Sequence, residues 1–391
     1  MSPKQTQAML AQGLEPVTMW DCRLGEAKAH PDGTPFSTEP PVPPCGLRLL
    51  WAAQQKGAGF AYGLVTQANR MRRALVAAGV SISYNPHQEH DFAVHFLPLD
   101  NFTPVVGKRN LLSSTMEMSE PTAPLSAVPA LLVVPCAFNK EVLGRTFSGP
   151  IEVCPLGVDT ETFAFHERKP PGPEEPFRVL FCGNSEDDTK GAQILKAAWR
   201  KWRASGRMPA NAQLYIKTTG TRALPLQYRV IENGELKGPF AASPSEPHAA
   251  LPKAEILDNR NLPLAELVEL YRSAHVLVSP SMGEGWNLVL CEAMATGLPC
   301  IWPAHTAMLD YGSEEIGFPV VDLEKHVFDK AEPNYYGWAP TVPDIITRLE
   351  EAYHAYPEAL ERGRRASARM QGYTWAAAAE KFIAICRRHL P

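Results

Sequence analysis

From residue 46 onward, short apolar runs of strand length alternate with longer segments in which apolar residues recur at helical spacing. The first run, at 46–52, is followed by a glycine-rich turn at 57–63 and by a helical pattern at 64–78 that ends before Gly79. A strand, a glycine turn, a helix and a further strand in this order indicate a doubly wound parallel sheet. The further strand-like runs of this half are 80–84, 92–97, 110–115 and 130–134.

The same alternation starts again at 177, after a polar, proline-rich stretch at 159–176 that we interpret as a linker. The predicted strands of this half are 177–183, 213–218, 254–257, 275–279 and 298–302. The predicted helices are 191–205, 264–273, 287–296, 345–356 and 375–388. The second half is therefore a second α/β domain.

The length of 391 residues fits about two domains at roughly 150–200 residues each. We predict an N-terminal Rossmann-like domain at 46–158 and a C-terminal one at 177–372, joined by the linker. Residues 1–45 form a proline-rich extension in which we expect little regular structure. Residues 373–391 hold a final helix.

The charge, the apolar runs and the cysteines of the chain limit the partners and the compartment that we expect. Lys and Arg number 38 against 42 Asp and Glu, a formal net charge of −4, so the chain as a whole makes no electrostatic case for nucleic acid or membrane. The longest apolar runs fall far short of the roughly 20 residues of a membrane span, and the N-terminus lacks a basic-then-apolar signal pattern. None of the eight cysteines forms a Cys-x-x-Cys pair. We therefore expect free thiols and a cytoplasmic protein, with peripheral contact to membrane or nucleic acid left open.

The segment 279–299 carries the strongest chemical signal. It orders a strand end, a tight glycine turn and a helix start, which is where open α/β sheets bind ligands. Backbone N–H groups of residues 285–287 would point from the helix start toward an anion such as a phosphate. Glu284 precedes this helix and Glu292 lies eight residues later, roughly 12 Å along a helix axis. Two carboxylates at that spacing suit hydroxyls on two sugars with a diphosphate between them, as in a nucleotide sugar.

This segment resembles the E-x7-E motif of family 4 glycosyltransferases, which have the GT-B fold. The resemblance covers about 47–388 and is strong in the C-terminal half and weak in the N-terminal half. It implies two Rossmann-like, doubly wound domains facing each other across a cleft, with the last helix packed back on the N-terminal domain. The other matching stretches are 153–163, 264–279, 310–311, 336–339 and 373–375.

The activity that this resemblance implies is transfer of a sugar from a nucleotide diphosphate sugar to a hydroxyl acceptor, with retention of the anomeric configuration. Glu284 would contact hydroxyls of the transferred sugar, and Glu292 the nucleotide ribose. Lys190, in the Lys-Gly pair after the first strand of the second domain, matches the lysine that neutralises the leaving diphosphate. Glu284 and Lys190 are therefore the candidate catalytic residues.

Asn184 stands where the family usually has an arginine, so one fixed cation is missing from the pattern. Lys217 or Arg178 would be the replacement. The resemblance implies a wider donor-binding set from the motif, the loop before Lys190 and the glycine loop of the first domain. This set comprises Gly59, Gly183, Asn184, Lys190, Lys217, Glu284, Gly285, Trp286, Asn287, Leu288 and Glu292.

The acceptor would be bound by the N-terminal domain, where Tyr62, Glu117 and His87 are the candidates. The alternatives, a plain turn around Tyr62 and a surface or helix-capping carboxylate at Glu117, stay open. His87, His90 and His95 lack the tight spacing of a metal site. No Asp-x-Asp pair occurs in the sequence. We expect neither a metal nor a cofactor beyond the donor substrate, in line with the metal independence typical of GT-B enzymes.

Three other functions stay open. Arg70, Arg72 and Arg73 form a small basic patch on the first predicted helix. It reads either as a solvated helix face or as a contact for an anionic acceptor, which leaves room for a transferase of modified DNA bases. A phosphorylase or epimerase would use a similar cleft. Loss of the usual arginine at Asn184 is also compatible with an inactive scaffold that binds a sugar nucleotide.

Overall fold

The computed structural model describes residues 45–52, 62–117, 119, 127–172, 175–218, 227–232, 235–241, 255–260, 262–330 and 334–391. All but the last residue of the predicted extension, and Gly59 of the glycine loop, lie outside the described residues. The chain divides into two compact units. The first unit runs to Gly157 and includes Tyr373–Pro391, and the second unit is Val158–Gly372.

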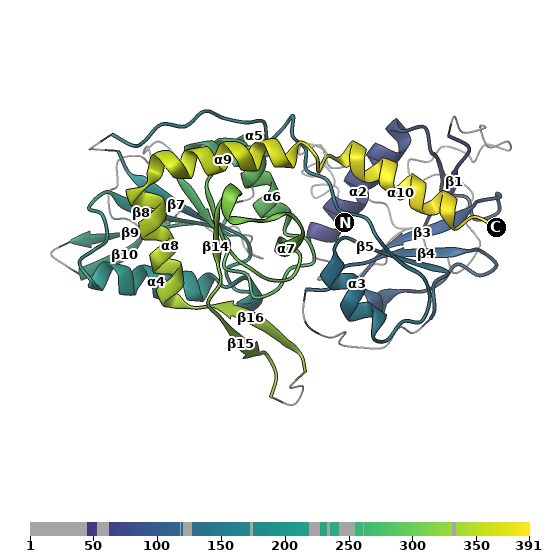
Figure 1. Cartoon of the computed structure of the whole chain (residues 1–391), viewed down its shortest axis with the longest axis horizontal. Coiled ribbons are helices and arrows are strands. Elements are labelled where there is room, and N and C mark those ends of the chain that lie inside the picture. Colours follow the sequence, from purple (N-terminus) through teal and green to yellow (C-terminus); the bar gives the residue numbers. More distant parts are fainter. Residues whose placement is uncertain are drawn as a thin grey trace. The chain divides into compact units, whose positions relative to one another are not determined.

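A six-stranded sheet forms the centre of the first unit (Figure 1), in the order β2-β1-β3-β4-β5-β6. Every pairing in it is parallel, as the alternation of strands and helices predicts. The short edge strand β6 was not predicted. The strands are β1 (Arg48–Trp51), β2 (Ser81–Ser83), β3 (Phe92–Phe96), β4 (Asn110–Ser113), β5 (Leu131–Val134) and β6 (Ile151–Val153).

Successive side chains of the central strands of this sheet enter two different apolar clusters, as the two-residue period of a strand requires. In β5, Leu131 and Val133 join the cluster formed with α2 and α10. Leu132 and Val134 join the cluster that contains Leu143 of α3. The helices of this unit are α2 (Tyr62–Ala77), α3 (Ala137–Gly144) and α10 (Trp375–Arg388).

The final helix of the chain, α10, completes the core of the first unit and lies beside α2 (Figure 1). Phe382 of α10 is buried and stacks on Phe96 of β3, with ring centroids 6.4 Å apart. Segments almost 300 residues apart in sequence therefore share one hydrophobic core.

The second unit is built on an eight-stranded sheet in the order β10-β9-β11-β8-β7-β12-β13-β14. Strands β11 to β14 of this order are parallel, whereas β9 and β10 form an antiparallel hairpin at one edge. The five predicted strands are confirmed as β7, β8, β11, β12 and β13. The strands are β7 (Phe177–Cys182), β8 (Ala212–Lys217), β9 (Gln227–Glu232), β10 (Glu235–Ala241), β11 (Glu255–Asp258), β12 (Val276–Val278), β13 (Cys300–Pro303) and β14 (Phe318–Val320).

Helices and a separate hairpin complete this unit. Trp199 and Trp202 of α4 are fully buried and meet edge to face, with ring centroids 5.8 Å apart, in the main core cluster. The helices are α4 (Ala192–Ala204), α5 (Leu264–Ser273), α6 (Leu288–Ala295), α7 (Met308–Tyr311), α8 (Val342–His354) and α9 (Tyr356–Met370). The hairpin pairs β15 (Leu323–Val327) with β16 (Tyr336–Pro340).

Helix α9 was missed by the sequence analysis, which placed a single helix at 345–356. The residues that α9 buries are mostly small, including Ala359, Gly363, Ala366 and Ser367, so its apolar period is faint. A Cβ at Gly363 would lie 2.2 Å from the carbonyl oxygen of Gly297, because the two backbones touch there. Close packing of small residues, rather than large apolar side chains, holds this helix in place.

Candidate functional site

The residues with candidate chemistry gather at the carboxyl ends of three neighbouring parallel strands of the second unit. These are β7, β12 and β13, adjacent in the sheet. The next strand in sequence after β7 is β8, on one side, whereas β12 lies on its other side. The order of the sheet therefore reverses between β7 and β12, and such a switch point is where open α/β sheets bind ligands.

The loop after β7 is held against the loop after β12 by backbone contacts. The Thr189 carbonyl accepts the N–H of Met282 at 2.7 Å and the Ser281 hydroxyl at 3.2 Å. Asp187 caps the short 3₁₀ turn before Gly191 by accepting the N–H of Thr189 at 2.9 Å. Lys190 lies in this turn, so its backbone is positioned from both sides.

Gly191 makes this close approach possible. It has φ of +69°, a left-handed conformation that favours glycine, and a Cβ there would lie 2.0 Å from the Pro280 carbonyl oxygen. Any side chain at Gly191 would push the two loops apart.

Lys190 and Glu284 form an ion pair across these two loops, with 3.2 Å between Nζ and Oε1. Their side chains retain 22% and 12% of their exposure, so the pair is largely desolvated but can still be reached by a ligand. Each charge offsets the burial cost of the other. The sequence analysis named both residues for separate roles, and the structure brings them together.

The backbone of Glu284 is fixed by the loop that follows β13. Its N–H donates to the Thr306 hydroxyl at 3.2 Å, and Thr306 adopts a left-handed φ of +48° that is unusual for a β-branched residue. The ring Nδ1 of His305 lies 3.1 Å from the same hydroxyl. The sequence analysis missed His305 and Thr306. Both follow the predicted strand 298–302, and polar residues at the carboxyl end of a parallel strand could have indicated them as site residues.

Burial lowers the pKa of His305 to about 4, because desolvation disfavours the charged imidazolium. The imidazole is therefore neutral at pH 7. It can orient the Thr306 hydroxyl without adding a second positive charge to the site.

Helix α6 starts later than predicted. Asn287, at φ +69°, is its N-cap and accepts the N–H of Leu290 at 3.1 Å, while its amide donates to the Ser279 hydroxyl at 3.0 Å. The first helical residue is Leu288, so residues 285–287 precede the helix and its N-terminal end lies further along the chain. Only about half of the interval from Glu284 to Glu292 is helical. The spacing of the two glutamates that the sequence analysis expected along a helix axis therefore does not apply to the whole interval.

Two aromatic residues brace this helix. The Tyr311 hydroxyl donates to the Trp286 carbonyl at 2.8 Å, and the two rings lie 5.1 Å apart, with Trp286 buried. The buried Tyr271 donates to the Glu292 carboxylate at 3.1 Å, and burial holds the pKa of Tyr271 well above its usual value. Glu292 thus has a fixed position on the helix and remains only partly buried.

The two residues considered as a second cation both form hydrogen bonds within the protein. The Lys217 ammonium donates to the carbonyls of Thr218, Arg260 and Asp258 at 2.8, 2.8 and 3.4 Å, and burial lowers its pKa. Arg178 is likewise buried and donates to Gln213 and Ser273. Both charged groups bond to atoms of the protein, and the donor-binding role suggested for them stays a prediction.

The remaining candidates are more loosely defined. Asn184 is exposed, and its side chain accepts the N–H of Glu186 at 3.1 Å, which caps the turn after Gly183. Glu117 and His87 are exposed and follow β4 and β2 of the first unit, and Tyr62 begins α2. Their acceptor role stays a prediction. Among the described residues, no three His, Cys, Asp or Glu side chains gather where they could hold a metal ion.

Comparison with known proteins shows a similarity to one family. The family model described as "Glycosyl transferases group 1" matches residues 176–325, a range that includes Lys190, Glu284 and Glu292. Over these residues, which are less than half of the chain, the protein is similar to the group 1 glycosyltransferases. A D-inositol 3-phosphate glycosyltransferase from Kineococcus radiotolerans is 29% identical over 257 residues, which are 61% of this chain. The match spans 52%, about half, of that relative.

One solved structure supports the fold. An α,α-trehalose 6-phosphate synthase from Burkholderia multivorans superposes with a TM-score of 0.53 at 13% identity, over 85% of this chain and 78% of that one. A sucrose-phosphate synthase from Thermosynechococcus elongatus gives 0.49 at 18% identity, over 72% and 68%. With its two Rossmann-like sheets, the protein has the GT-B fold. None of its described helices is both long and apolar enough for a transmembrane segment.

Gly191→Ala should separate the loops that hold Lys190 and Glu284. Gly206→Ala is a matched control, because Gly206 has φ of +71° but nothing within 4 Å of a Cβ. Both changes incur the left-handed penalty of about 1 kcal/mol. Gly191→Ala should lower the free energy of unfolding by about 1–3 kcal/mol more, from the clash with Pro280. Urea unfolding of both variants measures the difference, and equal losses would refute the contact.

His305 should make the second unit acid-sensitive. Its pKa is about 4 in the fold against an ordinary 6.5, so below pH 6.5 the unfolded chain binds a proton that the folded one does not. Stability then falls by up to about 1.4 kcal/mol per pH unit down to pH 4. His305→Gln should reduce that slope in urea unfolding at pH 7 and 5. The exposed His87 provides the control variant, His87→Gln, and a slope unchanged by His305→Gln would contradict the assignment.

Proposed function

We propose that this protein is a group 1 glycosyltransferase that transfers a sugar from a nucleotide diphosphate sugar to a hydroxyl acceptor, with retention of configuration and without a metal. The observation that carries the proposal is the Lys190–Glu284 ion pair at the switch point of the second sheet. It places a cation and a carboxylate side by side where a ligand of this fold binds.

Lys190 is suited to the leaving diphosphate. Negative charge develops on the leaving group as the bond to the sugar breaks, and a fixed ammonium stabilises that charge more than it stabilises the ground state. The position of Lys190 is set by the short turn capped by Asp187. With Lys217 and Arg178 engaged inside the protein, Lys190 carries the larger share of this task.

Glu284 is suited to the hydroxyls of the transferred sugar. A carboxylate can accept hydrogen bonds from two hydroxyls. The backbone N–H of Glu284 donates to the Thr306 hydroxyl, which fixes the position of the residue. The ion pair with Lys190 orients the carboxylate before the donor arrives. Glu292, held by Tyr271, would accept the ribose hydroxyls.

In this proposal the leaving group, and not a side chain of the protein, takes the proton from the acceptor hydroxyl. A departing diphosphate can take the acceptor proton on the face where the nucleophile enters, which agrees with retention. The relative from Kineococcus radiotolerans is named for an inositol phosphate acceptor, a polyhydroxylated compound. A hydroxyl acceptor is therefore the class we propose, and the nucleotide is to be found by screening.

Nucleoside diphosphate binding should depend on Lys190. We expect one of UDP, GDP, ADP, CDP or dTDP to stabilise the protein by about 2.7 kcal/mol at 100 times its dissociation constant. Lys190→Ala should remove most of this thermal shift. Lys201→Ala, at an exposed lysine of α4, should retain it. A shift of equal size in Lys190→Ala would rule out the proposed diphosphate contact.

The two glutamates should separate in steady-state kinetics with the donor found by that screen. Glu284→Gln removes a contact to the reacting sugar and should lower kcat on the order of 100-fold. Glu292→Gln removes a contact to the nucleotide and should raise the donor KM about tenfold with kcat little changed. If Glu284→Gln raised only KM, its assigned role would be wrong.

A further inference from the structure

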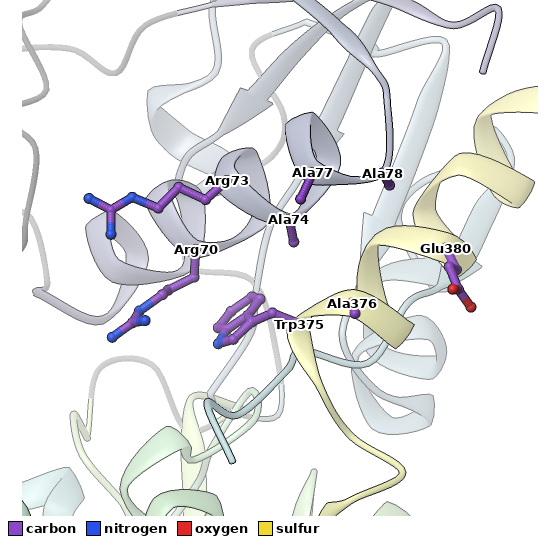
Figure 2. Close-up of a pocket in the computed structure, with 8 residues that line it drawn as sticks. All are labelled: Arg70, Arg73, Ala74, Ala77, Ala78, Trp375, Ala376 and Glu380. Atoms are coloured by element: carbon purple, nitrogen blue, oxygen red, sulfur yellow. The ribbon is translucent and has the colours of Figure 1, made fainter. Parts of the chain in front are cut away.

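The first unit contains a hollow of about 480 Å³ between α2 and α10 (Figure 2). That volume is within the range of small-molecule sites. Its lining combines two arginines and a glutamate with one indole and a floor of alanines. The lining residues are Arg70, Arg73, Ala74, Ala77, Ala78, Trp375, Ala376 and Glu380.

The hollow exists because small residues face each other across the two helices. Ala74 and Ala77 of α2 and Ala376 of α10 lack the side-chain bulk to fill the space between the helix backbones. Elsewhere the same pair of helices is closely packed, with Met71 and Leu75 buried against Phe382 in one cluster.

One wall of the hollow is held rigidly. Trp375 is partly buried and packs against the core of the first unit. Its backbone touches Gly157 so closely that a Cβ at Gly157 would lie 2.3 Å from the Trp375 nitrogen. A fixed indole presents a flat apolar face on which a ring can stack at little cost in entropy.

Positive charge is concentrated at one end. Arg70 and Arg73 are one turn apart on α2, and their guanidinium groups lie at the same end of the hollow as the Trp375 ring in Figure 2. Glu380 lies at the other end. Guanidinium groups bind phosphate oxygens in a planar, two-pronged geometry.

The start of α10 adds to this charge. Thr374 caps the helix by accepting the N–H of Ala377 at 3.1 Å, so Trp375 and Ala376 form its first turn, and both line the hollow. The positive end of the helix dipole is therefore at the same site as the two arginines.

From this geometry we propose that the hollow binds a phosphorylated small molecule that carries a ring. The phosphate lies at Arg70 and Arg73, the ring lies against Trp375 and the alanines, and a hydroxyl or amino group of the ligand donates to Glu380. This inference goes beyond the proposed function, because none of these residues belongs to the unit that holds Lys190 and Glu284.

The test is calorimetric titration with three ring phosphates, glucose 6-phosphate, AMP and phenyl phosphate, with unphosphorylated glucose as the negative control. It is performed on the full chain carrying Lys190→Ala, so that phosphate binding at the donor site does not contribute. At least one ring phosphate should bind at millimolar concentration or below, and glucose should not.

Arg70→Gln and Arg73→Gln should each weaken that binding about tenfold or more, from the loss of charged hydrogen bonds. Arg72→Gln is the matched control, because Arg72 is on the same helix with the same charge but does not line the hollow. It should leave the affinity unchanged. Circular dichroism of each variant separates loss of binding from loss of folding.

Several results would overturn the proposal. One is that no ring phosphate binds. Another is that Arg70→Gln, Arg73→Gln and Arg72→Gln all bind the ligand with the same affinity, whether unchanged or equally weakened. Sedimentation with phosphatidylglycerol vesicles provides a further test. Vesicle binding that falls equally in the three arginine variants would indicate a charged helix face and not a ligand site. None of these outcomes bears on Lys190, so the donor-site proposal is tested separately.

Discussion

The candidate active site depends on one close approach between two loops, in which Gly191 lies against the carbonyl of Pro280. Since a Cβ would not fit there, the loop after β7 can accept backbone hydrogen bonds from the loop after β12. That contact sets the separation of Lys190 and Glu284 at 3.2 Å. The backbone, and not a further side chain, therefore determines where the two charges lie relative to each other.

An ion pair in a largely desolvated site is a poor source of stability, since its attraction does little more than offset the loss of hydration. Its value here is preorganisation. Lys190 and Glu284 hold each other in place in the absence of substrate, and a donor that brings a diphosphate and sugar hydroxyls offers each a new partner. His305 contacts the Thr306 hydroxyl and is neutral at pH 7, so it supports this arrangement without adding a second cation that would attract the diphosphate.

Much of the fold could be predicted from the sequence, because buried parallel strands are short apolar runs and the helices between them have a clear period. The E-x7-E segment also revealed Glu284 and Glu292. The pairing of Lys190 with Glu284 could not be predicted, because these residues are 94 positions apart and only the sheet order brings their strands together. The contacts of Lys217 could not be predicted for a related reason, since the three carbonyls that its ammonium contacts have no signature in sequence.

The features that sequence reasoning missed share a physical cause. Gly157 against Trp375, Gly191 against Pro280 and Gly363 against Gly297 are all places where backbone touches backbone. An apolar pattern reports side chains that are present, whereas these contacts depend on side chains that are absent. The alanines between α2 and α10 extend the same argument, because there the absence of bulk leaves a space instead of a contact. At these positions, small residues therefore mark either a point of closest packing or a space that a ligand can fill, and the charge around them distinguishes the two.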